Sequence, residues 1–337
     1  MIAKMENSKI HIIAEAGSNN NGQLSKAKKL VDIAKRCNAN SVKFQLINTW
    51  GLYLPGKYEY GHYDIKEVIK FREDGEMTDT EYEALAEYCR KQEISFTASV
   101  FDKRGLDLML KFNPMYIKLA SCDLNNIRFL RRVAETGKKV VLSTGMSTLH
   151  DVEQAVKVMV NAGNSDLVLM HCVSIYPAYL EQTNLRFIEI LKKVFGFPVG
   201  FSDHTGNSIA ACVALSLGAT WFEKHFTEDK NQEGLDHKHA MDESELAGYV
   251  RDIRDTEVAL LLKEEKISED ERYTRKRARR SLYAATNLPF GHLIKDEDIL
   301  CVRPEGIMSA DQIDLLVGRT TICEISQFEP FTLDKIK

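Results

Sequence analysis

Charged residues and histidines gather in residues 221–241, WFEKHFTEDKNQEGLDHKHAM. An apolar run ends abruptly there in Glu223, Lys224 and His225, and Asp236 follows in the same segment. Removing an ion from water costs several kcal/mol unless the ion is paired or bound to a metal. These side chains therefore face either water at the end of a strand or a ligand.

Two histidines could bind a metal together. His204 and His225 each stand at the end of an apolar run, in FSDH and FEKH. If the two runs are neighbouring strands, the imidazoles lie close together, and two imidazoles near carboxylates suit Mn²⁺, Zn²⁺ or Fe²⁺. Asp236 could fold back over such a metal. On spacing alone, the alternative is that His204 and His225 are only hydrogen-bonded within the protein. For His171, too, the sequence leaves two interpretations, a histidine of the core or a ligand.

Two lysines predict a bound anion. Lys43 and Lys118 lie among apolar neighbours, in SVKFQ and YIKLAS. Lysines are almost never fully buried without a partner. Serines and threonines near the ends of other apolar runs supply further donors, although a lone hydroxyl at such a position is often a helix cap. Two lysines with a hydroxyl-rich rim suit a ligand that carries a phosphate and a carboxylate.

Eight short apolar runs must position these residues. Helical periodicity separates them, as in residues 25–38, 78–93, 148–163 and 243–262. Continuous apolar strands are typical of parallel sheets covered on both faces, and eight alternating strands and helices predict a (β/α)8 TIM barrel. An open doubly wound sheet is the alternative, but no GxGxxG follows the first run. The expected strands are residues 10–17, 41–47, 95–100, 115–121, 140–145, 167–174, 198–204 and 220–227.

A barrel would bring the polar ends of these strands together. Active sites of such barrels lie at the carboxyl ends of the strands. Every expected strand carries polar or ionisable residues near that end, so one shared pocket is predicted. In strand order they are Glu15; Lys43 and Gln45; Thr97 and Ser99; Lys118 and Ser121; Ser143 and Thr144; His171 and Ser174; Ser202, Asp203 and His204; and Glu223, Lys224 and His225.

Three regions lie outside this alternation. Residues 49–77 form an unusually long connection, which we expect to pack as a lid over the site. Residues 266–280 are expected to link a catalytic barrel at 1–265 to a small, mostly β domain at 281–337. The run RYTRKRARR (272–280) is basic but follows an acidic stretch, so a solvated linker is favoured over a functional basic patch.

The composition narrows the class of protein. The 337 residues carry a net charge of −4, which predicts no general affinity for nucleic acid. Seven cysteines without a CxxC pair indicate reduced thiols and a cytoplasmic protein. No signal-peptide core is evident, and no apolar run approaches the ~18 residues of a membrane span, so no membrane association is expected.

The motifs together resemble the sialic acid synthase family, which contains N-acetylneuraminate and legionaminic acid synthases. The C-terminal segment RRSLYAATNLPFGHLIKDEDILCVRPEG (279–306) resembles the family's antifreeze-like, or SAF, domain. In the barrel, the resemblance rests on IAEAGSNNNG (13–22), VKFQ (42–45), KLAS (118–121), LSTGM (142–146), HCVSIYP (171–177), GFSDHT (200–205), FEKHFT (222–227) and GLDH (234–237).

The resemblance implies an enzyme that condenses phosphoenolpyruvate with N-acetylmannosamine or a related acetamido hexose. The product would be a nonulosonic acid, and phosphate would be released. His204 and His225 would bind a divalent metal, Mn²⁺ first with Mg²⁺ or Co²⁺ as alternatives, that polarises the sugar aldehyde. The resemblance also implies a domain-swapped homodimer, in which Arg303 reaches the acetamido group from the partner subunit. Such a dimer would stabilise a second domain too small for a large core.

The resemblance assigns roles within the barrel. Glu15 and Glu223 would be catalytic carboxylates that handle protons or orient water. Asp236 is grouped with them and would also contact the sugar. The other sugar contacts would be Gln45, Asp123 and Tyr176. Phosphoenolpyruvate would bind to Lys43, Thr97, Lys118, Ser121, Ser143, Ser174 and Ser202.

Some positions depart from the family pattern. Asn20 replaces a common histidine, Leu235 a common proline and Ala240 a frequent serine. The stretch RPEGI is one residue shorter than usual, which bears on the placement of Arg303. The long connection at 49–77 is distinctive and could change which sugar fits.

Two other functions compete with this one. A synthase for a phosphorylated sugar, such as N-acetylmannosamine 6-phosphate, would be favoured by extra Lys or Arg residues near the sugar, and no such cluster is evident in the sequence. A non-catalytic carbohydrate-binding protein is the second alternative. The presence of both lysines, both histidines and Glu15 together argues against it.

Overall fold

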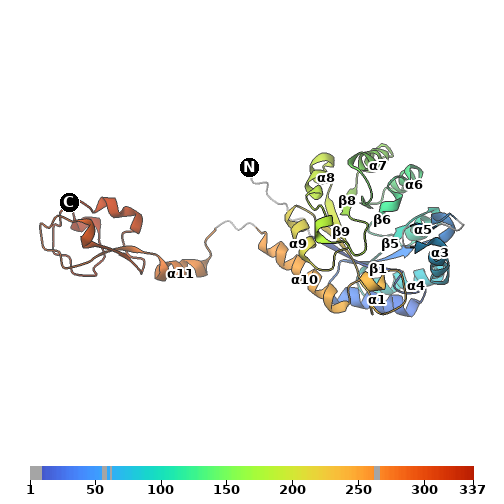
Figure 1. Cartoon of the computed structure of the whole chain (residues 1–337), viewed down its shortest axis with the longest axis horizontal. Helices are drawn as coiled ribbons and strands as arrows, with labels where there is room; N and C mark the ends of the chain where they lie inside the picture. The colour runs from blue at the N-terminus through green and yellow to red at the C-terminus, as the bar shows by residue number, and fades with distance from the viewer. Residues whose placement is uncertain (1–9, 55–58, 61–62, 262–265) are drawn as a thin grey trace. The chain divides into compact units, whose positions relative to one another are not determined.

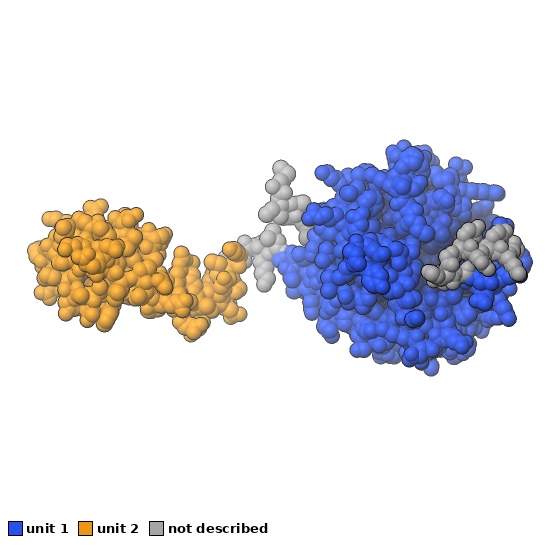
Figure 2. Space-filling view, viewed as in Figure 1, with its two compact units in different colours: residues 1–261 blue, residues 262–337 orange. Residues whose placement is uncertain are grey.

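The chain folds into two compact units, residues 1–261 and 262–337, which Figure 2 colours separately. The computed structural model describes residues 10–54, 59–60, 63–261 and 266–337. Each unit has a hydrophobic core of its own. All seven cysteines are free thiols. Within the described ranges, no helix combines the length and the apolar character that crossing a membrane requires.

Eight parallel strands close into a barrel in the first unit, which confirms the predicted TIM barrel. The order around the barrel is β1-β10-β9-β8-β7-β6-β5-β2, so the first and last strands of the barrel pair directly. All eight expected strands form, most of them shorter at their ends than expected. They are β1 (His11–Gly17), β2 (Ser41–Leu46), β5 (Ser95–Val100), β6 (Ile117–Leu119), β7 (Val140–Ser143), β8 (Leu167–Cys172), β9 (Val199–Asp203) and β10 (Trp221–His225).

Helices cover the outside of the strands (Figure 1). Some of them begin with a reciprocal capping box, formed by Thr78 and Glu81 at the start of α4 and by Thr148 and Asp151 at α7. The helices of the barrel are α1 (Leu24–Arg36), α4 (Asp79–Lys91), α5 (Lys103–Lys111), α6 (Ile127–Ala134), α7 (Leu149–Asn161), α8 (Phe187–Phe195), α9 (Ile209–Ser216) and α10 (Glu243–Ala259).

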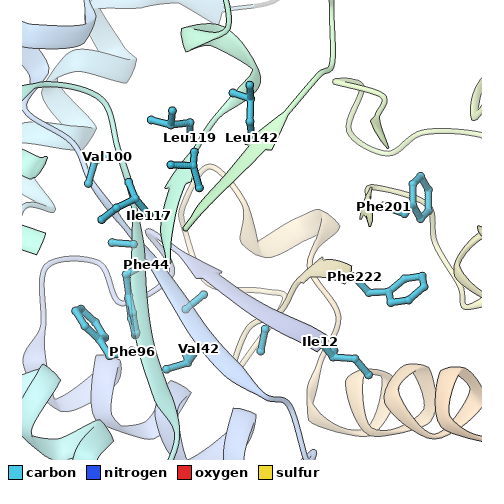
Figure 3. Close-up of a cluster of buried hydrophobic side chains, with 14 of the residues drawn as sticks. Ile12, Val42, Phe44, Phe96, Val100, Ile117, Leu119, Leu142, Phe201 and Phe222 are labelled. Carbon is cyan, nitrogen blue, oxygen red and sulfur yellow. The ribbon is translucent and has the colours of Figure 1, made fainter. Parts of the chain in front are cut away.

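The side chains of each strand alternate between the helices and the barrel interior. Figure 3 shows part of the outer layer, including Ile12, Val42, Phe201 and Phe222, which packs beneath the helices. Inside the barrel, the amino ends of the strands are closed by aromatic rings. His11 stacks on Trp221 with 4.1 Å between ring centroids. An apolar layer that includes Ile13 follows, and polar side chains occupy the carboxyl ends. Side chains therefore fill the barrel at the amino ends of the strands, and the polar site lies at the carboxyl ends.

The long connection contains two helices and a small hairpin. α2 (Thr49–Leu52) begins it, β3 (Glu59–Tyr60) pairs with β4 (Tyr63–Asp64), and α3 (Ile65–Asp74) ends it. Residues 55–58 and 61–62 lie outside the described residues. The Asp64 side chain caps α3 by accepting from the Lys66 N–H. This cap stabilises the first turn of α3, which lies at the rim of the barrel.

The second unit is small and mostly built of short β bridges, as predicted. Strands β11 (Ser281–Ala284) and β12 (Ile299–Val302) pair antiparallel, and isolated bridges join the remaining turns. Its core contains Leu282, Leu288, Ile325 and Phe331, among others. Part of the segment expected as a linker is helical: α11 (Glu269–Ala278) begins at the Ser268 cap. Its acidic first turn and basic last turn both suit the helix dipole.

Candidate active site

Four charged side chains converge inside the barrel near the carboxyl ends of the strands. Glu15, Lys43, Lys118 and Glu223 are at most 5% exposed. Lys43 Nζ lies 2.9 Å from Glu15 Oε2 and 3.5 Å from Glu223 Oε2, and Lys118 Nζ lies 3.9 Å from Glu223 Oε2. Two lysines and two glutamates thus form one buried group whose formal charges balance. We call it the charged cluster.

Hydroxyl groups surround the charged cluster. Lys43 donates to Ser99 Oγ at 2.8 Å, and Lys118 donates to Ser143 Oγ at 2.7 Å. Ser202 donates to Glu223 Oε1 at 2.9 Å. Charge-assisted hydrogen bonds of this kind fix the orientation of both ammonium groups. The structure therefore brings together four residues predicted to bind phosphoenolpyruvate: Lys43, Lys118, Ser143 and Ser202.

Thr97 and the serines of the rim are arranged differently. The Thr97 hydroxyl donates to the backbone carbonyl of Tyr116 at 3.1 Å. Ser121 accepts from the Gly145 N–H at 3.0 Å, and Ser174 Oγ lies 3.9 Å from Cys172 Sγ. These hydroxyl groups contact other groups of the protein and line the rim of the site. The positive charge of the site comes from Lys43 and Lys118.

The two buried glutamates have opposite pKa shifts. Burial raises the pKa of Glu15 to about 7, and the nearby Glu223 charge acts in the same direction against Lys43. Burial also acts upward on Glu223, but the charges of Lys118 and Lys43 outweigh it and hold the pKa of Glu223 at about 2. Burial lowers the pKa of Lys118, whereas the two carboxylates raise that of Lys43 against burial. Carboxyls with separated pKa values are the usual arrangement for acid–base catalysis.

His204 and His225 lie side by side at the same end of the barrel, 5.6 Å apart between ring centroids. The Tyr176 ring lies 4.0 Å from that of His204. His204 Nδ1 lies 2.6 Å from the Val173 carbonyl oxygen, so Nδ1–H donates, and the neutral form of the ring has its lone pair on Nε2. His225 Nδ1 and Asp236 Oδ2 are buried without hydrogen-bond partners and lie 4.0 Å apart. Burial lowers the pKa of His225 to about 4.

These residues fit a divalent metal through two imidazoles. Metal ligation requires neutral imidazole, and a hydrogen bond from the other ring nitrogen to a carbonyl is the usual support of a ligating histidine. His204 has that support, and His225 has an unused nitrogen. Among the described residues, however, no three His, Cys, Asp or Glu side chains form a group that could hold a metal. The protein would thus supply His204 and His225 and leave other coordination positions open.

The loop that carries Asp236 crosses the end of β1. A side chain at Gly17 would place its Cβ 2.7 Å from Asp236 Oδ2, and Gly17 also has a φ of +58°, so only glycine fits there. His237, in the short helix η3 (His237–His239), secures the same loop because its Nδ1 lies 2.7 Å from Thr227 Oγ1. Asp236 is therefore held next to His225.

Gln45 connects the charged cluster to the long connection. Its Nε2 donates to Glu15 Oε1 at 3.0 Å, and its Oε1 accepts from Arg72 Nη1 at 3.1 Å. Arg72 was not predicted from the sequence, and neither was Cys172, whose Sγ lies 4.0 Å from His204 Nδ1. No motif marks Arg72. Cys172 could have been found, because it lies near the carboxyl end of an expected strand.

Three other residues named in the sequence analysis have surroundings of their own. Asp123, at the end of the short helix η1 (Ser121–Asp123), is buried; burial raises its pKa to about 6, and its side chain contacts Cys122. Arg303 is exposed in the second unit. His171 is a core histidine: its Nε2 lies 2.6 Å from the Thr183 carbonyl, and its ring stacks on Phe201.

Lys224 and Thr144 make their polar contacts away from the charged cluster, although Lys224 and Asp203 also line the pocket at His204 and His225. Lys224 pairs with Asp203 at 3.4 Å and lies against the Tyr249 ring of α10. The Thr144 hydroxyl donates to the Met170 carbonyl at 3.1 Å. Adjacent residues of a strand point to opposite faces, so Glu223 and His225 enter the barrel while Lys224 lies between them on the helix side.

Comparison with known proteins agrees with this architecture. A model of the NeuB family matches residues 30–265, and a model of the SAF domain matches residues 279–337. An N,N'-diacetyllegionaminic acid synthase of Legionella pneumophila is 34% identical over 316 residues, which cover 91% of this chain and 89% of the relative. An N-acetylneuraminate-9-phosphate synthase of Drosophila melanogaster is 32% identical over 351 residues, covering 95% and 94%.

A solved structure extends the likeness to three dimensions. The N-acetylneuraminic acid synthetase of Leptospira borgpetersenii, crystallised with citrate, superposes with a TM-score of 0.70 at 32% identity, over 79% of this chain and 90% of that one. The family model alone covers most of the barrel. The chain therefore belongs to the NeuB family and carries a SAF domain at its C-terminal end.

Proposed function

We propose that this protein is a nonulosonic acid synthase that condenses phosphoenolpyruvate with an acetamido hexose and releases phosphate. The charged cluster beside His204 and His225 is the observation that carries the proposal. A buried pair of lysines can bind an anionic substrate, and adjacent imidazoles can bind a metal that activates an aldehyde. The names of the relatives, synthases of legionaminic and neuraminic acids, support the same class of product.

Phosphoenolpyruvate would bind at Lys43 and Lys118. Both ammonium groups are buried and oriented by Ser99 and Ser143, so they are preorganised to accept a phosphate and a carboxylate. Ser202, Ser121, Ser174 and Thr97 would complete the rim of this subsite. The sugar would lie toward Tyr176, Asp236, Gln45 and Asp123.

The reaction would join C3 of phosphoenolpyruvate to the aldehyde carbon of the open-chain sugar. The aldehyde oxygen takes up a proton and becomes a hydroxyl group. Water adds at C2 and loses a proton. The bond between C2 and the phosphate oxygen then breaks while the new C2 hydroxyl passes its proton to the departing phosphate, which leaves a keto group and inorganic phosphate. Glu15 and Glu223 would between them supply the one proton and accept the other.

The metal site is part of the proposal. When bound at His204 and His225, a divalent ion, Mn²⁺ before Mg²⁺ or Co²⁺, supplies Lewis-acid polarisation of the aldehyde oxygen. The chain's own contribution is orientation. Val173 fixes the His204 ring through its carbonyl oxygen, and Tyr176 covers that ring on the sugar side.

A domain-swapped homodimer would complete the sugar site. Arg303 is exposed in the second unit, close to the end of β12. In a swapped dimer it would reach the acetamido group in the partner's barrel. The small core of the second unit is consistent with a domain that gains stability from such a contact.

Phosphate release from phosphoenolpyruvate tests the proposal. The full chain, supplied with Mn²⁺, would be assayed with N-acetylmannosamine, its 6-phosphate and 2,4-diacetamido-2,4,6-trideoxymannose. We expect release that needs one of these sugars and stops when a chelator removes the metal. Folded protein that releases phosphate with none of them would refute the proposed function.

A further inference from the structure

A second hollow lies next to the charged cluster, between the loop after β1 and helix α3. Its walls include Ser18, Asn20, Ile47, Phe71, Arg72 and Tyr82. Gln45 separates it from the charged cluster and contacts both, through Arg72 on one side and Glu15 on the other. A substituent of a sugar bound near Glu15 could therefore extend into this hollow.

The walls of this hollow are held in place without a ligand. At one end, the backbone of Gly75 packs directly on Gly22, where a Cβ would lie 3.0 Å from the Gly75 carbonyl carbon. At the other end, the Tyr82 hydroxyl donates to the Gln45 carbonyl at 3.1 Å. The Gly75 contact fixes the end of α3, which carries Arg72, and the Tyr82 contact fixes α4 against β2. The hollow is thus a preformed subsite.

Two buried polar atoms in the walls have no partner. Arg72 uses Nη1 to reach Gln45, but its Nε is buried without a hydrogen bond. The hydroxyl oxygen of Ser18 is buried without one as well. A buried donor that lacks an acceptor destabilises the folded protein, so such groups need an explanation. A ligand that carries a hydrogen-bond acceptor would satisfy the Arg72 Nε–H, and the Ser18 hydroxyl offers such a ligand a second polar contact.

The Glu76 carboxylate and the apolar walls of the hollow indicate that the part of the ligand bound there is uncharged. Glu76 also lines the hollow, where its carboxylate disfavours a bound anion, and it is paired with Arg104 at 2.9 Å. A phosphate would bring its anionic oxygens close to the Glu76 carboxylate in the same wall, whereas the buried unpartnered atom of Arg72 is a single nitrogen, Nε. A carbonyl oxygen needs only one or two donors, and a methyl group beside it would pack on Ile47 and Phe71. An acylamino group has both parts.

We propose that Arg72 is a specificity-determining residue that donates to the carbonyl oxygen of an acylamino substituent of the acceptor sugar. This inference rests on the proposed function. The substituent is additional to the acetamido group that Arg303 would reach, so the favoured acceptor carries two acylamino groups. Because Arg72 also holds Gln45 against Glu15, correct seating of the substituent is coupled to the position of a catalytic carboxylate.

Acceptor preference tests the inference in the full-length protein. The value of kcat/KM would be measured for N-acetylmannosamine, its 6-phosphate and 2,4-diacetamido-2,4,6-trideoxymannose. The variants are Arg72→Met, Arg72→Lys and Ser18→Ala. Lys70→Met is the matched control, because it removes an exposed charge from the same helix without touching the hollow. Thermal unfolding would verify that each variant folds.

We expect wild-type protein to prefer the diacetamido sugar. Arg72→Met should lower kcat/KM for that sugar about 10- to 100-fold more than for N-acetylmannosamine, the range for one hydrogen bond from a charged donor. Arg72→Lys should not restore the preference, because lysine lacks the Nε of the guanidinium fork. Ser18→Ala should shift it in the same direction by a smaller factor, which keeps the test valid if Arg72→Met fails to fold.

Two results would overturn the inference alone. An equal loss for both unphosphorylated sugars would mean that Arg72 acts only through Gln45. Preference for the 6-phosphate, lost in Arg72→Met, would mean that the hollow binds an anion. If wild-type protein turns over none of the sugars, the proposed function fails and the inference fails with it.

Discussion

Lys43 and Glu15 face each other across β2 and β1, with 2.9 Å between Nζ and Oε2, and neither side chain is more than 2% exposed. The same lysine lies 3.5 Å from Glu223. Lys43 therefore contacts both carboxylates of the charged cluster, and Lys118 supplies the second positive charge. The stability of the barrel and the chemistry of the site depend on the same contact.

Replacing Lys43 with methionine should destabilise the protein strongly. Breaking a buried pair leaves an uncompensated charge and costs about 3–5 kcal/mol in the free energy of unfolding. Denaturant unfolding at pH 8, above the pKa of about 7 of Glu15, would measure the loss. The double variant Lys43→Met/Glu15→Gln should recover much of the stability and stay inactive. A double variant no more stable than Lys43→Met would show that the pair is not what couples these residues.

The two adjacent imidazoles predict a measurable metal affinity. His204→Gln and His225→Gln should each weaken Mn²⁺ binding about 100-fold or more, because even the loss of a supporting contact to a ligating histidine costs about 10- to 100-fold. Paramagnetic resonance of free Mn²⁺ would give the affinity. His171→Gln is the matched control, since His171 is also buried but bonds to Thr183. Equal losses in all three variants would point to general damage instead of ligation.

His11, which stacks on Trp221 at the amino ends of the barrel strands, predicts a pH dependence of stability. Burial, assisted by Arg254, lowers the pKa of His11 from 6.5 to about 4. Between these values the unfolded chain binds a proton that the folded protein does not. The stabilising contribution is therefore present above pH 6.5 and is lost as pH falls through about 4. The loss would be at most about 3 kcal/mol.

The variant His11→Phe isolates this contribution. Phenylalanine can still stack on Trp221, and Ser41 keeps its 2.8 Å contact with the Tyr116 hydroxyl. Wild-type protein should lose stability relative to His11→Phe on going from neutral pH to pH 4. Parallel curves for the two proteins across that range would show that His11 does not titrate with folding.

A swapped dimer predicts complementation between two inactive variants. Glu15→Gln disables the barrel, and Arg303→Ala disables the contribution of the partner. In a hybrid dimer one of the two sites is intact, so random exchange of subunits should restore about a quarter of the wild-type activity. A mixture of Glu15→Gln and Lys118→Met is the control, because both changes lie in the barrel and no hybrid has an intact site. Absence of recovery in the first mixture would refute the shared site.

The strands and the charged cluster could be predicted because strands that are buried on both faces appear in the sequence as continuous apolar runs. Runs such as LVLMHC hold six consecutive buried residues, which only a strand covered on both faces explains. Lys43 and Lys118 stood out as charges within such runs. What the runs do not reveal is which face each residue takes in the closed barrel. His171 and His225 look alike in sequence, yet the first packs on Phe201 and the second on His204.

The sequence did not predict that the long connection (residues 49–77) contributes Arg72 to the site. Arg72 follows no motif, and its place depends on how α3 docks on the loop at Gly22, a contact between residues distant in sequence. For α11 the local signals were present, with Ser268 as a cap and acidic then basic turns. We interpreted that charge pattern as a solvated linker, because the helix has no buried face to mark it.

The fate of oxygen from water tests the central claim most directly. The reaction would be run with phosphoenolpyruvate and the preferred sugar in ¹⁸O-labelled water, and the released phosphate would be analysed by mass spectrometry. If water adds at C2 and the bond between C2 and oxygen breaks, phosphate forms only when sugar is present and carries no ¹⁸O. Phosphate that contains ¹⁸O would mean attack at phosphorus, and phosphate that forms without sugar would mean hydrolysis without carbon–carbon bond formation. Either result would contradict a nonulosonic acid synthase.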